Sequence, residues 1–145
     1  MNQWGMVGRA IELAVNAHEG QIDKSGYPYI LHPMRVMLTF NDPYLMAISI
    51  LHDMVEDTNV TLEDLSYNEF PERVIEGVRA LTHLKADSND EYYAKVKKNK
   101  DALEVKIRDI FDNMSTDRMK LLSERDRIKL AVKYGHALEV LYGKD

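Results

Sequence analysis

The sequence predicts an all-α fold, and three observations lead to this prediction. Apolar residues recur at steps of three and four along most of the chain, which is the spacing of one face of an α-helix. No stretch shows the apolar–polar alternation of a half-buried strand. Prolines and helix-capping residue types stand between the apolar stripes, where helices begin. We therefore expect residues 1–145 to form a single domain, a bundle of about eight helices with short connections.

The first half of the chain contains three predicted helices and one long loop. A helix over residues 2–18 leads into the segment from His18 to Pro33, whose glycines and prolines predict a shaped surface loop. A short helix follows over residues 33–40. Asp42-Pro43 then opens a central helix, because Asp caps helices and Pro suits their first turn. The residues expected on the apolar faces of the first and central helices are Trp4, Val7, Ala10, Ile11, Ala14 and Ala17, and Leu45, Met46, Ile48, Ile50 and Leu51.

The second half of the chain is predicted to be mostly helical, with a polar connection over residues 86–89. Thr61 and Asp64 have the spacing of a capping box, as do Ser88 and Glu91, and Phe70-Pro71 opens a helix between them. Two longer helices follow, over residues 102–114 and about 124–142, and the last one looks structural. The residues expected on the apolar faces of these two helices are Leu103, Ile107, Ile110, Phe111 and Met114, and Ile128, Leu130, Ala131, Leu138 and Leu141.

The composition of the chain argues against several classes of binding partner and metal site. The net charge is −5, which argues against broad binding to nucleic acid or to an anionic membrane. There is no cysteine, so disulfides and thiolate metal sites are excluded. No apolar run approaches the ~20 residues of a membrane span, and the N-terminal residues lack the pattern of a signal peptide. We expect a cytoplasmic protein whose partner is a small molecule.

The most informative stretch follows the central helix and runs from Leu51 to Thr58. His52 and Asp53 are each followed four residues later by a carboxylate, Glu56 or Asp57, so these side chains share neighbouring helix faces. Packed carboxylates repel one another unless a cation or bound protons compensate them. The alternative is a helix end that faces solvent. A metal ion with His52 and Asp53 as ligands is the sharper hypothesis.

Two further segments carry candidate ligands. His32 precedes Pro33, which restricts it and favours a helix start just after it, so His32 is held rigidly at a helix entrance. Asp109 lies among apolar positions, where a carboxylate needs a partner. A salt bridge from Lys106 or Arg108 would satisfy Asp109, and a metal ion is the alternative.

At this point the sequence resembles the HD-domain phosphohydrolases, and more narrowly the hydrolase domain of the Rel/SpoT alarmone enzymes and the small alarmone hydrolases. The motifs that carry the resemblance stand in the family's order over roughly residues 10–115. They are Ala17-His18-Glu19-Gly20-Gln21, the segment Lys24 to Val36 (KSGYPYILHPMRV), Leu51 to Thr58 (LHDMVEDT) and Val105 to Asn113 (VKIRDIFDN).

The resemblance implies a site and an activity. It implies that one divalent metal ion, usually manganese, is bound and that a carboxylate pair beside it moves protons. The activity it implies is removal of pyrophosphate from the 3′ position of guanosine tetra- or pentaphosphate. The implied metal ligands are His32, His52, Asp53 and Asp109, the implied acid–base pair is Glu56 and Asp57, and the implied substrate contacts are Lys24, Ser25, Asn113 and Thr116.

Three positions depart from the family pattern. Asp23 stands where these enzymes commonly carry an arginine that stacks on guanine, and a carboxylate provides no cation–π stack. Ile110 and Asp112 replace an arginine and a histidine. Two alternatives therefore remain open. One is the same chemistry on another nucleotide (an adenosine alarmone, NADPH 2′-phosphate or a nucleoside monophosphate), and the other is a regulator that binds a nucleotide without cleaving it.

Overall fold

The computed structural model describes residues 2–143, and within them the chain is all-helical, as predicted. Ten helices form, of which α4 and α9 are single turns, so eight longer helices account for the predicted bundle. The described residues contain no strand, only an isolated bridge between Ile22 and Pro28. The helices are α1 (Gln3–Ala17), α2 (Leu31–Leu38), α3 (Pro43–Leu51), α4 (Met54–Asp57), α5 (Leu62–Tyr67), α6 (Glu72–Leu81), α7 (Asn89–Lys97), α8 (Lys100–Asn113), α9 (Thr116–Met119) and α10 (Glu124–Tyr142).

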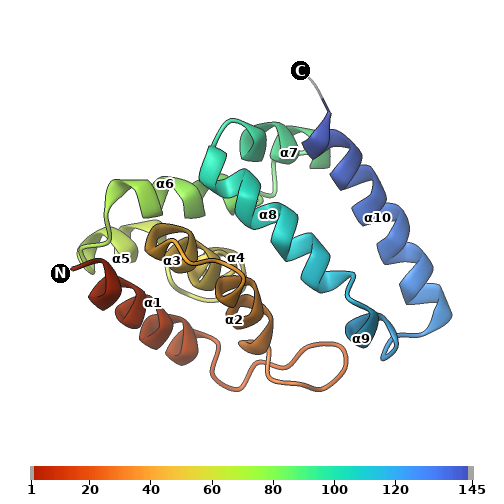
Figure 1. Cartoon of the computed structure of the whole chain (residues 1–145), viewed down its shortest axis with the longest axis horizontal. Helices are drawn as coiled ribbons and strands as arrows, with labels where there is room; N and C mark the ends of the chain where they lie inside the picture. The colour runs from red at the N-terminus through yellow and green to blue at the C-terminus, as the bar shows by residue number, and fades with distance from the viewer. Residues whose placement is uncertain (1, 144–145) are drawn as a thin grey trace.

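The centre of the bundle is α3, which packs against α1, α2, α6 and α8. Every residue from Ala47 to Leu51 is buried, including the polar Ser49, whose hydroxyl donates to the backbone carbonyl of Leu45. The contact between α3 and α6 depends on Gly77, because a Cβ atom there would lie 2.6 Å from Cδ1 of Ile48. In Figure 1, α8 runs between the α2–α3 pair and α10, so it connects the two sides of the molecule.

The predicted helix starts form as expected. The Asp42 carboxylate accepts hydrogen bonds from the backbone N–H groups of Tyr44 and Leu45. Capping boxes begin both α5 and α7. The central helix, however, ends at Leu51, and α4 begins at Met54, so His52 and Asp53 lie in the turn between two helices rather than on one continuous helix.

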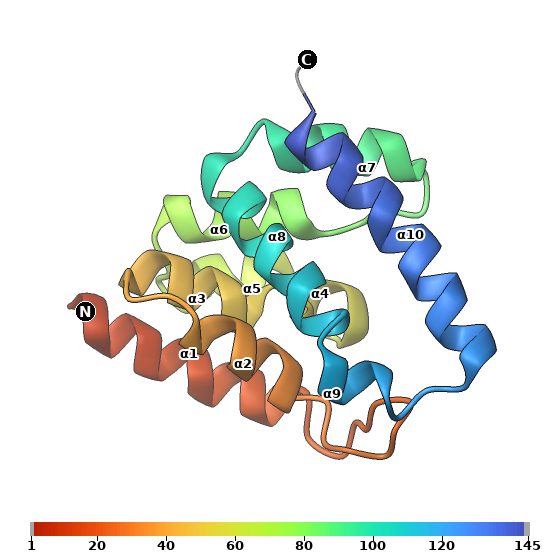
Figure 2. The same cartoon turned by 45° about the vertical axis from the view of Figure 1, so that its right-hand side comes forward.

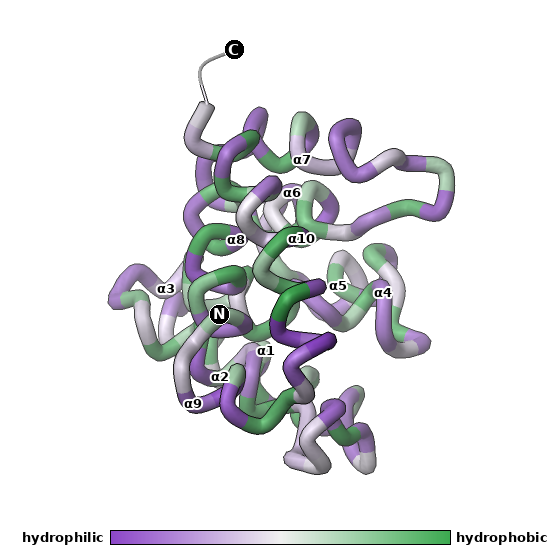
Figure 3. The backbone as a smooth tube through the Cα atoms, turned by 90° about the vertical axis from the view of Figure 1, so that its right-hand side faces the viewer, coloured by the Kyte–Doolittle hydropathy of each residue, from purple (hydrophilic) through white to green (hydrophobic). Residues whose placement is uncertain are grey.

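Four residues predicted on apolar faces, Trp4, Phe111, Ile128 and Ala131, are exposed, so these predictions were wrong. Trp4 is 60% exposed, Phe111 is 53% exposed and Ile128 is 58% exposed. In each case the packed stripe is narrower than the apolar pattern. On α10 the buried residues are Tyr134, Ala137 and Leu141, whose steps of three and four leave Ile128 on the outer side with Ala131. Figure 3, which looks onto α10, shows hydrophobic and hydrophilic residues mixed along this helix.

The loop between α1 and α2 passes next to α9, as Figures 1 and 2 both show. Gly20 and Gly26 have φ angles of 79° and 85°, which glycine adopts without strain. Between them, the Asp23 carboxylate accepts hydrogen bonds from the backbone N–H groups of Ser25 and Tyr27. The tip of the loop is therefore shaped by its own sequence. Within residues 2–143 no helix has the length and apolar character needed to cross a membrane.

Candidate metal centre and adjoining hollows

The structure brings the four predicted metal ligands together. One ligand atom each from His32, His52, Asp53 and Asp109 lies within 4.8 Å of the other three. They come from α2, from the turn between α3 and α4, and from α8, which meet near the middle of the molecule (Figure 1). The two imidazoles and Asp109 are buried, and Asp53 is partly exposed. Such a mixed set of nitrogen and oxygen donors can hold a first-row divalent metal ion.

Both imidazoles are oriented by an acceptor on Nδ1. His52 Nδ1 donates to the backbone carbonyl of Ser49 at 2.5 Å, and His32 Nδ1 donates to the Asp112 carboxylate at 2.7 Å. The protons on Nδ1 leave Nε2 of each ring as the inward-facing atom. These Nε2 atoms lie 2.6 Å (His32) and 3.2 Å (His52) from Oδ1 of Asp109. This is how metal-binding histidines are usually held.

The cluster needs positive charge at its centre. Two Nε2 lone pairs facing a carboxylate at these distances would repel it, so either protons or a cation must lie between them. Burial alone would lower the pKa of His52, but the charges of Asp53 and Asp109 outweigh burial and raise it to about 9. The pKa of His32 is also raised, against burial, by hydrogen bonds to Asp109 and Asp112. The donor set therefore fits a divalent metal ion, which would replace these protons.

Two side chains hold the carboxylates of the cluster. Lys106 donates from Nζ to Oδ2 of Asp109 at 3.1 Å, so the salt bridge that the sequence offered as an alternative forms while Oδ1 still faces the histidines. Although burial would raise it, the pKa of Asp109 is well below its usual range because of Lys106 and the two histidines. Tyr29 donates its hydroxyl proton to Oδ2 of Asp53 at 2.7 Å.

Glu56 and Asp57, the predicted acid–base pair, lie on α4 beside the cluster. The backbone N–H of His83, in the connection between α6 and α7, donates to the Glu56 carboxylate. Partial burial raises the pKa of Glu56, and the negative charges of Asp53 and Asp57 raise it further. Partial burial and Asp53 likewise raise the pKa of Asp57. Raised carboxyl pKa values beside a metal cluster are typical of proton-transferring groups.

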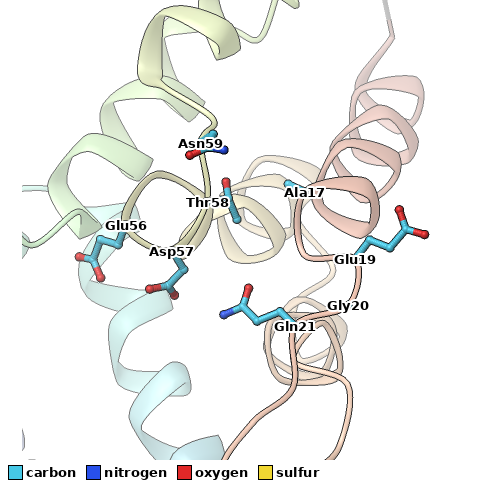
Figure 4. A pocket seen from close by; sticks show the side chains of 8 residues that line it. All are labelled: Ala17, Glu19, Gly20, Gln21, Glu56, Asp57, Thr58 and Asn59. Atoms are coloured by element: carbon cyan, nitrogen blue, oxygen red, sulfur yellow. The ribbon is translucent and has the colours of Figure 1, made fainter.

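Three hollows meet around these carboxylates. The smallest, about 230 Å³, is lined by three of the candidate metal ligands, His32, Asp53 and Asp109, and on its other side by α10; it is called the hollow of the metal ligands below. A second hollow of about 570 Å³, called the larger hollow below because it exceeds the adjoining 230 Å³ hollow, lies between the α1–α2 loop, α9 and α10. The third, about 620 Å³, is shown in Figure 4, where the Gln21 amide and the Asp57 carboxylate point into the same opening. The second hollow has the volume that small-molecule sites commonly have.

Of the predicted substrate contacts, Lys24, Ser25 and Asn113 line the 570 Å³ hollow, and Asn113 also lines the hollow of the metal ligands. Thr116 does not line these hollows. It is exposed in the first turn of α9, whereas Arg118 of the same helix lines two of them.

Four further residues line both hollows and were not predicted from the sequence: Tyr29, Arg118, Lys133 and Tyr134. Tyr29 stood within a quoted motif, which was the available signal. The other three lie on α9 and α10, and α10 had been interpreted as structural. That interpretation is incomplete, because one face of α10 forms a wall of the site.

Two of the three departures from the family pattern, Asp23 and Asp112, form a connected network through Arg118. Asp112 accepts hydrogen bonds from His32 and, on both oxygens, from Arg35. These contacts outweigh burial and lower the pKa of Asp112 to about 2. Arg118 lies between Asp112, at 3.3 Å, and Asp23, at 3.8 Å. Asp112 therefore supports a metal ligand rather than lining the larger hollow.

Comparisons with known proteins agree with the resemblance. The chain is 33% identical over 137 residues to a guanosine-3′,5′-bis(diphosphate) 3′-pyrophosphohydrolase of Aquifex aeolicus, covering 86% of this chain and 19% of that protein. It is 33% identical over 124 residues to a GTP pyrophosphokinase of Streptomyces coelicolor, covering 77% of this chain and 15% of that protein. The chain thus spans less than a fifth of the length of these curated relatives. No family model matches the chain.

The fold has a counterpart among solved structures. A structure described as that of a metazoan ortholog of SpoT that hydrolyzes ppGpp superposes with a TM-score of 0.79. The match covers 97% of this chain and 87% of the other, at 22% sequence identity. The helical bundle described above is therefore the fold of that protein.

Proposed function

Because the chain belongs to the HD-domain family of the Rel/SpoT hydrolase type, we propose that it is a metal-dependent hydrolase that removes pyrophosphate from the 3′ position of guanosine tetra- or pentaphosphate. The observation that carries this proposal is the convergence of four ligand atoms within 4.8 Å of one another, beside a carboxylate pair and a hollow large enough for a nucleotide. The proposal treats residues 1–145 as one hydrolase domain with manganese as its metal ion.

The roles of this chain's own residues follow from their positions. His32, His52, Asp53 and Asp109 would hold the metal ion, which when bound lowers the pKa of a water molecule and polarises a phosphoryl group. Lys106 and the Ser49 carbonyl keep Asp109 and His52 in the orientation that presents Oδ1 and Nε2.

The residues that would transfer protons, Glu56 and Asp57, lie on α4. Glu56 and Asp57 line the hollow of the metal ligands, and partial burial raises the pKa of both, which suits one of them to donate a proton while the other accepts one. The charge of Asp57 contributes to the raised pKa of Glu56, so these two carboxylates titrate as a pair rather than as separate residues.

The test is product release from guanosine tetraphosphate with manganese and with a chelator, resolved by anion-exchange chromatography. Manganese-dependent appearance of GDP and pyrophosphate supports the proposal. Bound metal without turnover counts against it and favours one of two alternatives. Turnover of adenosine alarmones or NADPH would assign another nucleotide, which the carboxylate of Asp23 beside the larger hollow favours. Nucleotide binding without turnover of any nucleotide would assign a regulator.

Two variants test the assigned roles. Asp53→Ala should abolish both metal binding and turnover, because it removes one of four ligands. Glu56→Gln should keep the metal ion and lose most turnover, by about 100- to 10,000-fold for a proton-transferring group. Metal content by atomic absorption separates the two roles, and loss of metal in Glu56→Gln would make Glu56 a ligand instead.

A further inference from the structure

The larger hollow is lined by more positive charge than its carboxylates compensate. Lys24 on the α1–α2 loop, Arg118 on α9 and Lys133 on α10 all line it, against the carboxylates of Asp23 and Asp57. Within residues 2–143, neither Lys24 nor Lys133 has a carboxylate at ion-pair distance. Cations that converge on a hollow without a protein partner create a site for an anion.

The surroundings of the Lys133 ammonium group also favour an anion site. Partial burial and repulsion by the ammonium groups of Lys106 and Lys24 lower its pKa. Its side chain lies over the ring of Tyr134, with Nζ 5.3 Å from the ring centroid, rather than against an acid. Lys106 is neutralised by Asp109, so the unbalanced charges are those on the loop and on α10. An anionic group in the hollow would relieve this repulsion.

Arg118 is held in place and still has donors to offer. Its Nη1 donates to Oδ1 of Asn113 at 2.6 Å and to Oδ2 of Asp112 at 3.3 Å. Its Nη2 has only the longer contact of 3.8 Å to Asp23 among the described residues. The guanidinium is thus fixed by one edge, and N–H groups remain for a ligand. A fixed guanidinium suits phosphate oxygens because its planar donors match their spacing.

The position of this positive charge next to the candidate metal site indicates which kind of nucleotide would bind. Arg118 and Lys133 line both the larger hollow and the hollow of the metal ligands, so the two spaces adjoin along these residues. Building on the proposed function, we infer that Arg118 and Lys133 form a subsite for a second phosphate group of the nucleotide. The site then selects nucleotides that carry phosphate at two separate positions, one group at the metal ligands and the other at α9–α10.

The test compares two guanosine nucleotides that share the 3′-diphosphate. One carries a 5′-diphosphate as well, and the other has a free 5′-hydroxyl. The main variant is Lys133→Met, which keeps the length of the side chain and breaks no ion pair between described residues. The matched control is Lys129→Met, which removes the same charge from an exposed position of α10 that does not line the hollow.

Lys133→Met should raise KM for the doubly phosphorylated nucleotide by about 10- to 100-fold, the loss expected for one charge-assisted hydrogen bond, with little change in kcat. KM for the nucleotide with a free 5′-hydroxyl should stay unchanged, and Lys129→Met should behave as the wild type does. Arg118→Lys, which also changes the contacts with Asn113 and Asp112, should raise KM more for the doubly phosphorylated nucleotide than for the other, since it keeps a positive charge but loses the planar donors. Equal losses on both nucleotides would overturn the inference, because the residues would then serve the scissile group or the fold.

Equilibrium binding in the presence of chelator separates this inference from the proposed function. Without metal there is no turnover, and Kd for each nucleotide is measured by calorimetry on the wild type and on Lys133→Met. A loss of affinity in Lys133→Met that is confined to the doubly phosphorylated nucleotide supports the subsite. If the metal-loaded protein releases no pyrophosphate, that result contradicts only the proposed function. Equal affinity of the wild type for both nucleotides would overturn the subsite.

Discussion

Asp112 gives the sharpest test of how the metal ligands are held. Its carboxylate accepts a hydrogen bond from Nδ1 of His32 at 2.7 Å, and the Asp112 side chain is only 14% exposed. Arg35 donates hydrogen bonds to both carboxylate oxygens, at 2.9 and 3.2 Å. Asp112→Ala removes the acceptor that fixes the tautomer and ring angle of His32. The Ser49 carbonyl continues to orient His52. One of the two imidazoles therefore loses its support.

The expected cost is a metal affinity that falls by about 10- to 100-fold, the usual effect of removing such a partner. This corresponds to roughly 1.4 to 2.7 kcal/mol. Asp112→Asn should lose less, because an amide oxygen still accepts from Nδ1 while its charge is gone. The assay is a manganese titration by calorimetry, with a competing chelator to bring the affinities into range.

The matched control is Asp101→Ala. Asp101 lies on the same helix, is 18% exposed and also accepts two hydrogen bonds from one arginine, Arg73, at 2.8 and 3.1 Å. It touches no histidine, so its loss should leave metal affinity unchanged. Equal metal affinity of Asp112→Ala and Asp101→Ala would refute the claim that the carboxylate orients His32.

Gly77→Ala should destabilise the protein by about 1 to 3 kcal/mol, because the new Cβ atom would lie 2.6 Å from Cδ1 of the buried Ile48. Gly135→Ala, with nothing within 4 Å, should instead stabilise it by up to about 1 kcal/mol, and urea denaturation measures both. In the metal-free protein, the pKa of His52 is raised to about 9 from its ordinary 6.5, so the stabilising effect of its proton is complete below pH 6.5 and is lost as pH rises through 9. Urea denaturation in chelator should show a fall in stability of roughly 3 kcal/mol over this range, and a stability that rises with pH would contradict it.

The fold was predictable because its signals are local. The stripe in α3 and the caps at Asp42, Thr61 and Ser88 depend on residues a few positions apart, and all of them form. Exposure was harder to predict, since it depends on which part of an apolar stripe meets another helix. Phe111 has the right spacing to be buried, yet α8 already packs through Val105 and Ile110.

In the candidate site, too, some residues could be predicted from a local motif and others only from the tertiary structure. His52, Asp53, Glu56 and Asp57 lie within six residues, so their chemistry could be read from one motif. Arg118 and Lys133 showed no such pattern, because their place at the hollow comes from the turn after α8 and the return of α10 beside it (Figure 2). Lys133 is exposed, as a lysine on an amphipathic helix usually is, and only its place beside the hollow distinguishes it from the other lysines of α10.

Asp23 and Asp112 replace basic residues of the family pattern, and each alone would put an unmatched negative charge near the nucleotide. The structure links them, because Arg118 lies between their carboxylates, at 3.8 and 3.3 Å, and Arg35 adds a second positive charge at Asp112. Asp23 also fixes the loop tip that carries Lys24 through two backbone hydrogen bonds. The two departures are therefore parts of one network with Arg118. It follows that restoring arginine at position 23 alone would place two guanidinium groups side by side, so base recognition in this chain must be tested with positions 23 and 118 changed together.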